Sequence, residues 1–143
     1  MDSAKRVMSG TWGEVWLEGD KVAECYGLQA KTSYNKEDVP MCGTMSVGSK
    51  VKSIKNTGSM KLHKTSSRMA ILIAAKIKAG QDVRVTIISK LADPDAYGAE
   101  RVVLKDVSFD DLTLADWEAD NFGKVECPFT FADFEFLDMV TPQ

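Results

Sequence analysis

The stretch Trp12-Gly13-Glu14-Val15-Trp16-Leu17-Glu18-Gly19-Asp20 decides the fold class. From 12 to 18 its even positions carry tryptophan or glutamate, and its odd positions carry glycine, valine or leucine. This period of two is typical of a β-strand, whose successive side chains point to opposite faces. Gly19-Asp20 interrupts the alternation before Val22, Tyr26 and Leu28 resume it, which predicts a two-residue hairpin, because glycine accepts positive φ.

Further strand-like segments follow along the chain. Alternation predicts strands over residues 51–64, 83–91 and 101–109, and a further strand around 112–117. The cluster Asp93-Pro94-Asp95-Ala96-Tyr97-Gly98 predicts a turn between two of them. Most of the chain is therefore expected to be antiparallel sheet.

The aromatic run near the C-terminus changes face part-way along. One face takes Val125, Cys127, Phe129 and Phe131, and the other takes Phe134 and Phe136. A bulge or bend near Ala132-Asp133 would reconcile the two sets. Pro128 has no N–H to donate, so it indicates an edge, a bulge or the start of a strand.

One segment has helical spacing, and one has no period at all. Apolar residues recur at helical spacing over residues 67–79, with Ser66 or Ser67 as N-cap and Gly80 as the stop. Residues 35–50 carry glycine, proline and hydroxyl side chains with no sustained period, which predicts a long loop. Long loops in compact domains are often functional, so this loop is the first place to expect a partner contact.

These elements predict a mainly β (α+β) fold, an antiparallel β-sandwich or small barrel with one flanking α-helix. The 143 residues fit a single domain, 1–143, with a flexible N-terminus (1–10) and C-terminal tail (139–143). The longest uncharged apolar stretch, Met69 to Ala75, is too short to cross a bilayer. No apolar segment follows Lys5 and Arg6, so no secretory signal is expected and synthesis is expected in the cytoplasm.

Charge is segregated along the chain. Residues 39–81 contain no acid and eight Lys or Arg, whereas residues 82–143 contain 14 acids and five bases. Three explanations stay open: a nucleic-acid footprint, a folded surface that interleaves both signs, or complementary faces on a self-assembling subunit. The pI near 5.2 makes the first the least favoured.

The residues offer little for catalysis, cofactors or metals. His63 is the only histidine, and Cys25, Cys42 and Cys127 are widely spaced, which favours reduced thiols over a metal site or a disulfide framework. The 93–100 segment lacks the ligands of a calcium loop, and the 43–50 segment lacks the lysine position of a phosphate loop. We expect no catalytic, cofactor-binding or metal-ligating residues, no enzyme activity, and a subunit that assembles.

Several segments, taken in order, resemble the tail tube proteins of contractile-tailed phages and phage-like elements. They are residues 9–17, 35–41, 88–101, 108–118 and 128–131. The resemblance implies a structural subunit of the inner tail tube, similar in fold to the tube proteins of type VI secretion. It implies hexameric rings in which one sheet of each subunit joins its neighbours in an inner barrel, and rings that stack into a hollow conduit.

The resemblance also implies partners and a location. The partners are other copies of the subunit, the tail sheath protein, the baseplate, the tape measure protein and the tail terminator, with DNA present only in transit through the lumen. The location is the virion or phage-like particle, after synthesis in the bacterial host cytoplasm. Whether that particle is an infectious phage, a defective prophage or a bacteriocin stays open.

Two sets of contact residues follow as hypotheses. The inter-ring loop takes Asn35, Lys36, Glu37, Asp38, Val39, Pro40, Met41, Lys50 and Lys52. The lumen-facing acids are Asp110, Asp111 and Asp116, because an acidic channel repels DNA and lets it slide. The alternative functions are a small β-barrel ligand binder and a nucleic-acid-binding module that uses lysines 50, 52, 55, 61 and 64 with Arg68.

Overall fold

The computed structural model describes residues 4–142 and confirms a mainly β fold with one α-helix. Short 3₁₀ turns at Ala4–Arg6 and Gly10–Trp12 precede the first strand. The strands are β1 (Gly13–Leu17), β2 (Asp20–Lys21), β3 (Cys25–Val39), β4 (Gly48–His63), β5 (Val85–Leu91), β6 (Glu100–Phe109), β7 (Lys124–Thr130) and β8 (Asp133–Asp138). Helix α1 (Arg68–Lys78) follows β4 and precedes β5 in the sequence.

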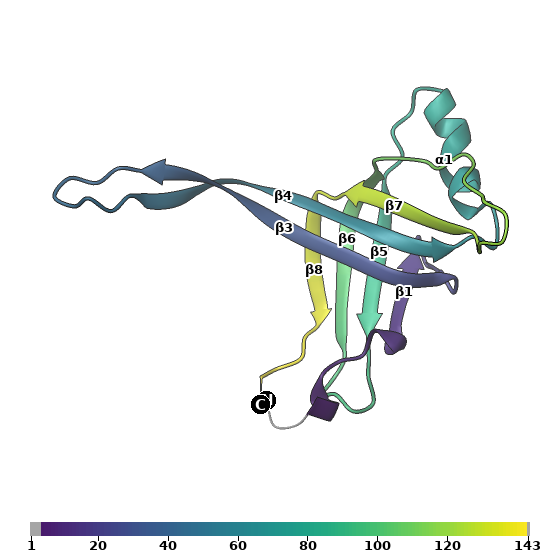
Figure 1. Cartoon of the computed structure of the whole chain (residues 1–143), viewed down its shortest axis with the longest axis horizontal. Helices are drawn as coiled ribbons and strands as arrows, with labels where there is room; N and C mark the ends of the chain where they lie inside the picture. Colours follow the sequence, from purple (N-terminus) through teal and green to yellow (C-terminus); the bar gives the residue numbers. More distant parts are fainter. Residues whose placement is uncertain (1–3, 143) are drawn as a thin grey trace.

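Two antiparallel sheets cross one another to form a sandwich (Figure 1). The β1 sheet runs in the order β2, β1, β5, β6, β8, and the β3 sheet in the order β3, β4, β7. Strand β6 connects them, because its last residues, Ser108 and Phe109, pair with β7. Figure 1 shows the β3 sheet running across the strands of the β1 sheet, with α1 beside one end.

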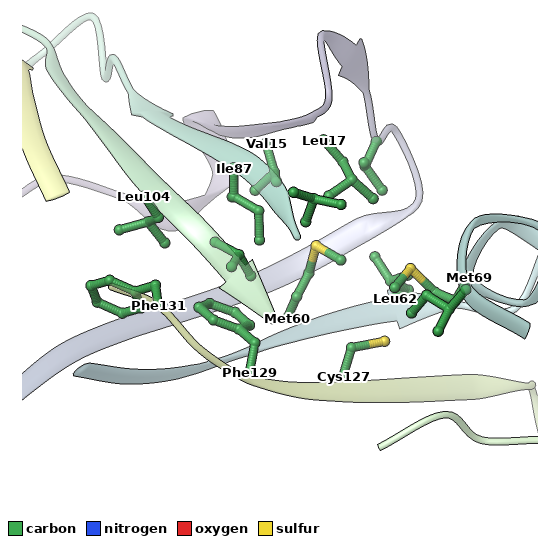
Figure 2. Close-up of a cluster of buried hydrophobic side chains, with 14 of the residues drawn as sticks. Val15, Leu17, Met60, Leu62, Met69, Ile87, Leu104, Cys127, Phe129 and Phe131 are labelled. Carbon is green, nitrogen blue, oxygen red and sulfur yellow. The ribbon is translucent and has the colours of Figure 1, made fainter. Parts of the chain in front are cut away.

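The core lies between the two sheets, where alternate residues of facing strands meet (Figure 2). Its fully buried members are Met60, Ile87, Leu104, Val107 and Phe129. Val15 and Leu17 point into the same core, as the alternation of the opening stretch predicts. Burying each such side chain contributes about 1.5–3 kcal/mol, so the sandwich is held together mainly by apolar burial.

The predicted hairpin exists, but its turn lies one residue earlier than Gly19-Asp20. Trp16 pairs with Lys21 and Leu17 with Asp20, so the turn residues are Glu18 and Gly19. Both have positive φ, 52° and 85°. Gly19 adopts this conformation without the steric cost that a Cβ imposes, which explains why glycine marks the turn.

Helix α1 confirms the predicted helix to within one residue at each end. It buries Met69 and Ile73 and carries lysines at 76 and 78 in its last turn, where cations interact favourably with the helix dipole. Ser67 is the N-cap residue, although its side chain makes no capping hydrogen bond. Gly80 follows the helix with φ of 76°, the left-handed conformation that commonly ends a helix.

The predicted bend in the aromatic run is confirmed. Strand β7 ends at Thr130 and β8 begins at Asp133, and between them the chain passes from the β3 sheet to the β1 sheet. The Phe131 N–H donates to Asn56 O and the Ala132 N–H to Lys105 O, so the bend is bonded to both sheets. The parity change at 132–133 therefore marks a change of sheet.

Two sequence predictions are wrong. The loop over 35–50 is shorter, covering 40–47, because β3 and β4 stay paired as far as Val39 and Gly48. A register shift between Asn35 and Lys36 breaks the alternation there, so the strands have no visible period in the sequence. The strand around 112–117 is absent: this segment is irregular and pairs with no strand in the described chain.

The N-terminal segment packs near the 93–98 turn. The Ser9 N–H donates to Asp93 Oδ2 at 2.9 Å, and Arg6 Nη1 donates to Asp95 O at 3.1 Å. The sequence predicts flexible termini over 1–10 and 139–143. Residues 1–3 and 143 lie outside the described residues, and the flexibility of both termini stays a prediction. No helix within residues 4–142 is long and apolar enough to span a membrane.

Candidate assembly surfaces

The β3–β4 hairpin projects beyond the sandwich as a long arm (Figure 1). Strand β7 pairs with β4 only from Thr57 to His63, whereas β3 and β4 continue together to Val39 and Gly48. We define the arm as residues 33–55. Over this length each strand has only the other as a partner in the described chain, so each leaves one edge of backbone N–H and C=O groups open to another molecule.

The apolar face of the sandwich continues onto the arm. Leu28 pairs with Met60 at the core. Tyr34 pairs with Ile54 six residues further along each strand, and because this spacing is even, the second pair lies on the same face as the first. Tyr34 and Ile54 are 65% and 54% exposed. Two large apolar side chains thus lie on the core side of the sheet where the second sheet no longer covers them.

Side-chain hydrogen bonds fix the base of the arm. Thr32 Oγ1 donates to Asn56 Oδ1 at 2.8 Å, and Asn56 Nδ2 donates to Ala132 O at the bend between β7 and β8. The arm therefore leaves the body in a defined direction.

All nine predicted inter-ring residues lie on the arm and are exposed. Residues 35–39 are the end of β3, Pro40 and Met41 begin the tip, and Lys50 and Lys52 are on β4. The structure brings the residues of β3 next to the two lysines of β4, since Glu37 pairs with Lys50 and Lys36 pairs with Val51. Their role between rings stays a prediction.

An open groove of about 500 Å³ lies between the two sheets near the base of the arm. Apolar side chains from β3, β6, β8 and the bend line it, among them Leu28, Leu104, Phe131, Phe134 and Phe136. Phe134 and Phe136 pack edge to face, with centroids 6.1 Å apart, and both remain exposed. The outer edge of β8 pairs with no strand in the described chain, so apolar surface and open backbone lie together.

The predicted lumenal acids lie in the irregular segment between β6 and β7. We call residues 110–123 the connection. Asp110, Asp111 and Asp116 are in it, and Figure 1 shows the chain between β6 and β7 passing beside α1. The Asp110 N–H donates to Pro128 O at 2.8 Å, and residues 111–114 border a small cavity with the first turn of α1. Their position relative to a lumen stays a prediction.

The connection also exposes large apolar residues that sequence reasoning missed. Leu114, Trp117 and Phe122 are 86%, 86% and 92% exposed. The sequence does contain one indication that this segment is exposed: it has five acids and no base, an unfavourable composition for a buried strand.

The titratable groups with shifted pKa values serve the structure. The Arg68 guanidinium, 2.7 Å from Glu24, donates a hydrogen bond that holds the pKa of this nearly buried carboxyl below its ordinary value. The pair ties the first turn of α1 to the chain entering β3. Burial raises the pKa of the Cys25 thiol and raises that of Cys127 to about 11. Both thiols are thus protonated at neutral pH and poorly suited to nucleophilic or metal chemistry.

Comparison with known proteins connects this architecture to a family. The phage tail tube protein family matches residues 2–138. The chain belongs to this family. This tube subunit is 32% identical over 134 residues to the phage-like element PBSX protein XkdM of Bacillus subtilis strain 168, covering 92% of this chain and 91% of the relative. Its role is that of a structural subunit of a tail tube.

Solved structures share the fold of the tube subunit. A chain in the sheath/tube terminator of the extracellular contractile injection system PVC matches with a TM-score of 0.75 at 10% identity, covering 95% of this chain and all of that one. A chain in the extended PVC sheath–tube complex matches with a TM-score of 0.73 at 10% identity, covering 97% and 100%. The β-sandwich fold with a flanking helix, implied by the resemblance, is confirmed.

Proposed function

We propose that this subunit forms hexameric rings that stack into the hollow inner tube of a contractile phage tail or phage-tail-like particle. The observation that carries the proposal is the family match over residues 2–138. Matched chains in solved structures come from a sheath–tube complex, a tube-terminating cap and a six-fold symmetrised baseplate, which supports a ring of six and contacts with sheath, terminator and baseplate.

Ring closure uses the open edge of the β1 sheet. Strand β8 extends over six residues and pairs only with β6 in the described chain. A strand of the neighbouring subunit added there satisfies the open backbone groups and removes a free edge that otherwise invites aggregation. The same neighbour covers Phe134 and Phe136 and withdraws their exposed apolar surface from water.

The arm makes the contact between rings. The β3–β4 hairpin runs across the strands of the β1 sheet, and the arm continues in this direction beyond β8 (Figure 1). Strands of a closed barrel tilt by about 35–45° from the barrel axis, so an element that crosses them is also oblique to the axis. An oblique arm that projects beyond the body reaches past the rim of its own ring to a subunit of the next one.

The lumen and the remaining partners complete the proposal. Asp110, Asp111 and Asp116 would give the channel negative charge, so that DNA in transit is repelled from its wall. The tape measure protein would occupy the channel during assembly. The particle is the location, and the host cytoplasm the place of synthesis.

Electron microscopy of the purified subunit over a range of concentrations tests the proposal. We expect rings and tubes, with six-fold class averages in end-on views. A variant in which Asn-Gly replaces residues 40–47 should still form rings but should stack poorly, because its arm is shorter. A wild-type protein that stays monomeric at every concentration and does not incorporate into tails contradicts the function.

A further inference from the structure

Besides the surface at Phe134 and Phe136, the structure carries two exposed apolar surfaces for which the described chain provides no cover. One is the face of the arm around Tyr34 and Ile54, and the other is the connection with Leu114, Trp117 and Phe122. Several large apolar side chains exposed on one segment mark an interaction site, because water contact with them is unfavourable. Each surface therefore needs an occupant.

The two surfaces have opposite charge. The arm carries four lysines, at 36, 50, 52 and 55, against two acids, Glu37 and Asp38. Both acids are on β3 together with one lysine, whereas β4 carries three lysines and no acid over this length, so the positive charge is concentrated on β4. The connection carries five acids and no base. Surfaces of opposite charge attract and select one another, and this selection favours the arm as the occupant of the connection.

The contact has to join different copies of the chain. The arm projects from one end of the body, and the connection lies at the other end with α1 (Figure 1). The hydrogen bonds of Asn56 at the base hold the arm in its direction, so it does not fold back over its own body. A contact between different surfaces at opposite ends repeats from copy to copy and extends an assembly.

We propose that the arm of one subunit docks on the connection of another copy, with the arm's lysines facing the acids and Trp117 packed against its apolar face. This inference rests on the proposed function and names the acceptor surface of the arm. It gives Asp116 and its neighbours a contact role in addition to the lumenal charge proposed above. Trp117 is the expected anchor, because a large aromatic side chain withdrawn from water contributes most to an interface.

Paired charge reversals test the contact. The arm variant is Lys50→Glu/Lys52→Glu/Lys55→Glu, and the connection variant is Asp116→Lys/Glu118→Lys/Asp120→Lys. Each alone should raise the concentration needed for tubes about tenfold or more, and the two sets combined in one chain should restore most of the loss. A matched control, Lys21→Glu/Lys61→Glu/Lys90→Glu, changes the net charge equally outside the arm and should assemble like the wild type. Thermal unfolding of each free subunit confirms that the variants fold.

Fluorescence of Trp117 gives a second measurement that does not depend on charge. In a Trp12→Phe/Trp16→Phe background, Trp117 is the single tryptophan, and acrylamide should quench it strongly in the free subunit and several-fold less in tubes. Tubes in which Trp117 is as accessible as in the free subunit overturn the inference, as does a control that loses assembly as severely as the arm variant. In either case the wild-type tubes still support the proposed function, whereas wild-type protein that never assembles removes the basis of both.

Discussion

Replacing Gly58 by alanine tests how closely the central strand of the β3 sheet packs at the base of the arm. Gly58 pairs with Ala30 on one side and with Phe129 on the other. A Cβ at this position would overlap Gln29 O and would lie 2.7 and 2.8 Å from Cζ and Cε2 of the buried Phe129 ring. Because Phe129 is fully buried, the ring has little room to move away.

The expected cost is that of overpacking a core, about 2–3 kcal/mol of unfolding free energy for the added methyl group. For a domain of this size the loss corresponds to a fall in Tm of roughly 7–10 °C, measured by calorimetry or circular dichroism on the free subunit. Gly10→Ala is the matched control, since its Cβ would meet no atom of the described chain within 4 Å. It should change stability by less than about 0.5 kcal/mol.

A double-mutant cycle separates the two obstacles. In a Phe129→Leu background the ring atoms are gone but Gln29 O remains, so adding alanine at 58 should cost less than in the wild type without becoming neutral. A Gly58→Ala protein as stable as Gly10→Ala would refute the reasoning, because it would mean that the strands can separate at no cost.

Three further predictions concern stability and access. The pKa of Glu24 is lower in the folded protein than its ordinary value of 4.5, so the ionised carboxylate stabilises the fold at any pH above 4.5. Thermal melts at a series of pH values should therefore show that the stability advantage of the wild type over Glu24→Gln shrinks as the pH falls below 4.5. Exposed Cys42 should react with a maleimide at once in the native subunit and buried Cys127 only after unfolding; mass spectrometry checks this, and equal rates would contradict it. Asp93→Ala should cost about 2 kcal/mol and speed proteolysis before residue 13, because the buried carboxylate holds the N-terminal segment, whereas Asp95→Ala should have little effect.

The sequence predicts the strands well where one face is buried. Val15 and Leu17 alternate with partly exposed neighbours because the core imposes a period of two, and the parity change before Phe134 follows from the change of sheet. The same reasoning fails on the arm. Beyond Asn56 no second sheet covers the strands, so no period is imposed, and the register shift at Asn35 hides what remains.

The candidate site is predictable only in part. Residues 35–41, Lys50 and Lys52 do gather on the arm, where 35–39, Lys50 and Lys52 are in paired strands and only Pro40 and Met41 are in the loop. Residues 112–117 of the connection are predicted as a strand, but only Leu112 and Leu114 follow a period of two, and Trp117 does not. Leu112 packs against the core, while the other two point to water. Alternation alone does not distinguish a strand from an exposed binding segment that happens to share its spacing.

In the proposed assembly, an arm on one end of the subunit gives the tube a direction. Every ring added presents the same unsatisfied surface outward, so one end of a growing tube always displays arms and the other always displays empty acceptors. The two ends then differ in chemistry, and a protein that starts the tube needs a different binding surface from one that stops it. Polarity of the whole particle can thus be specified by the placement of a single hairpin.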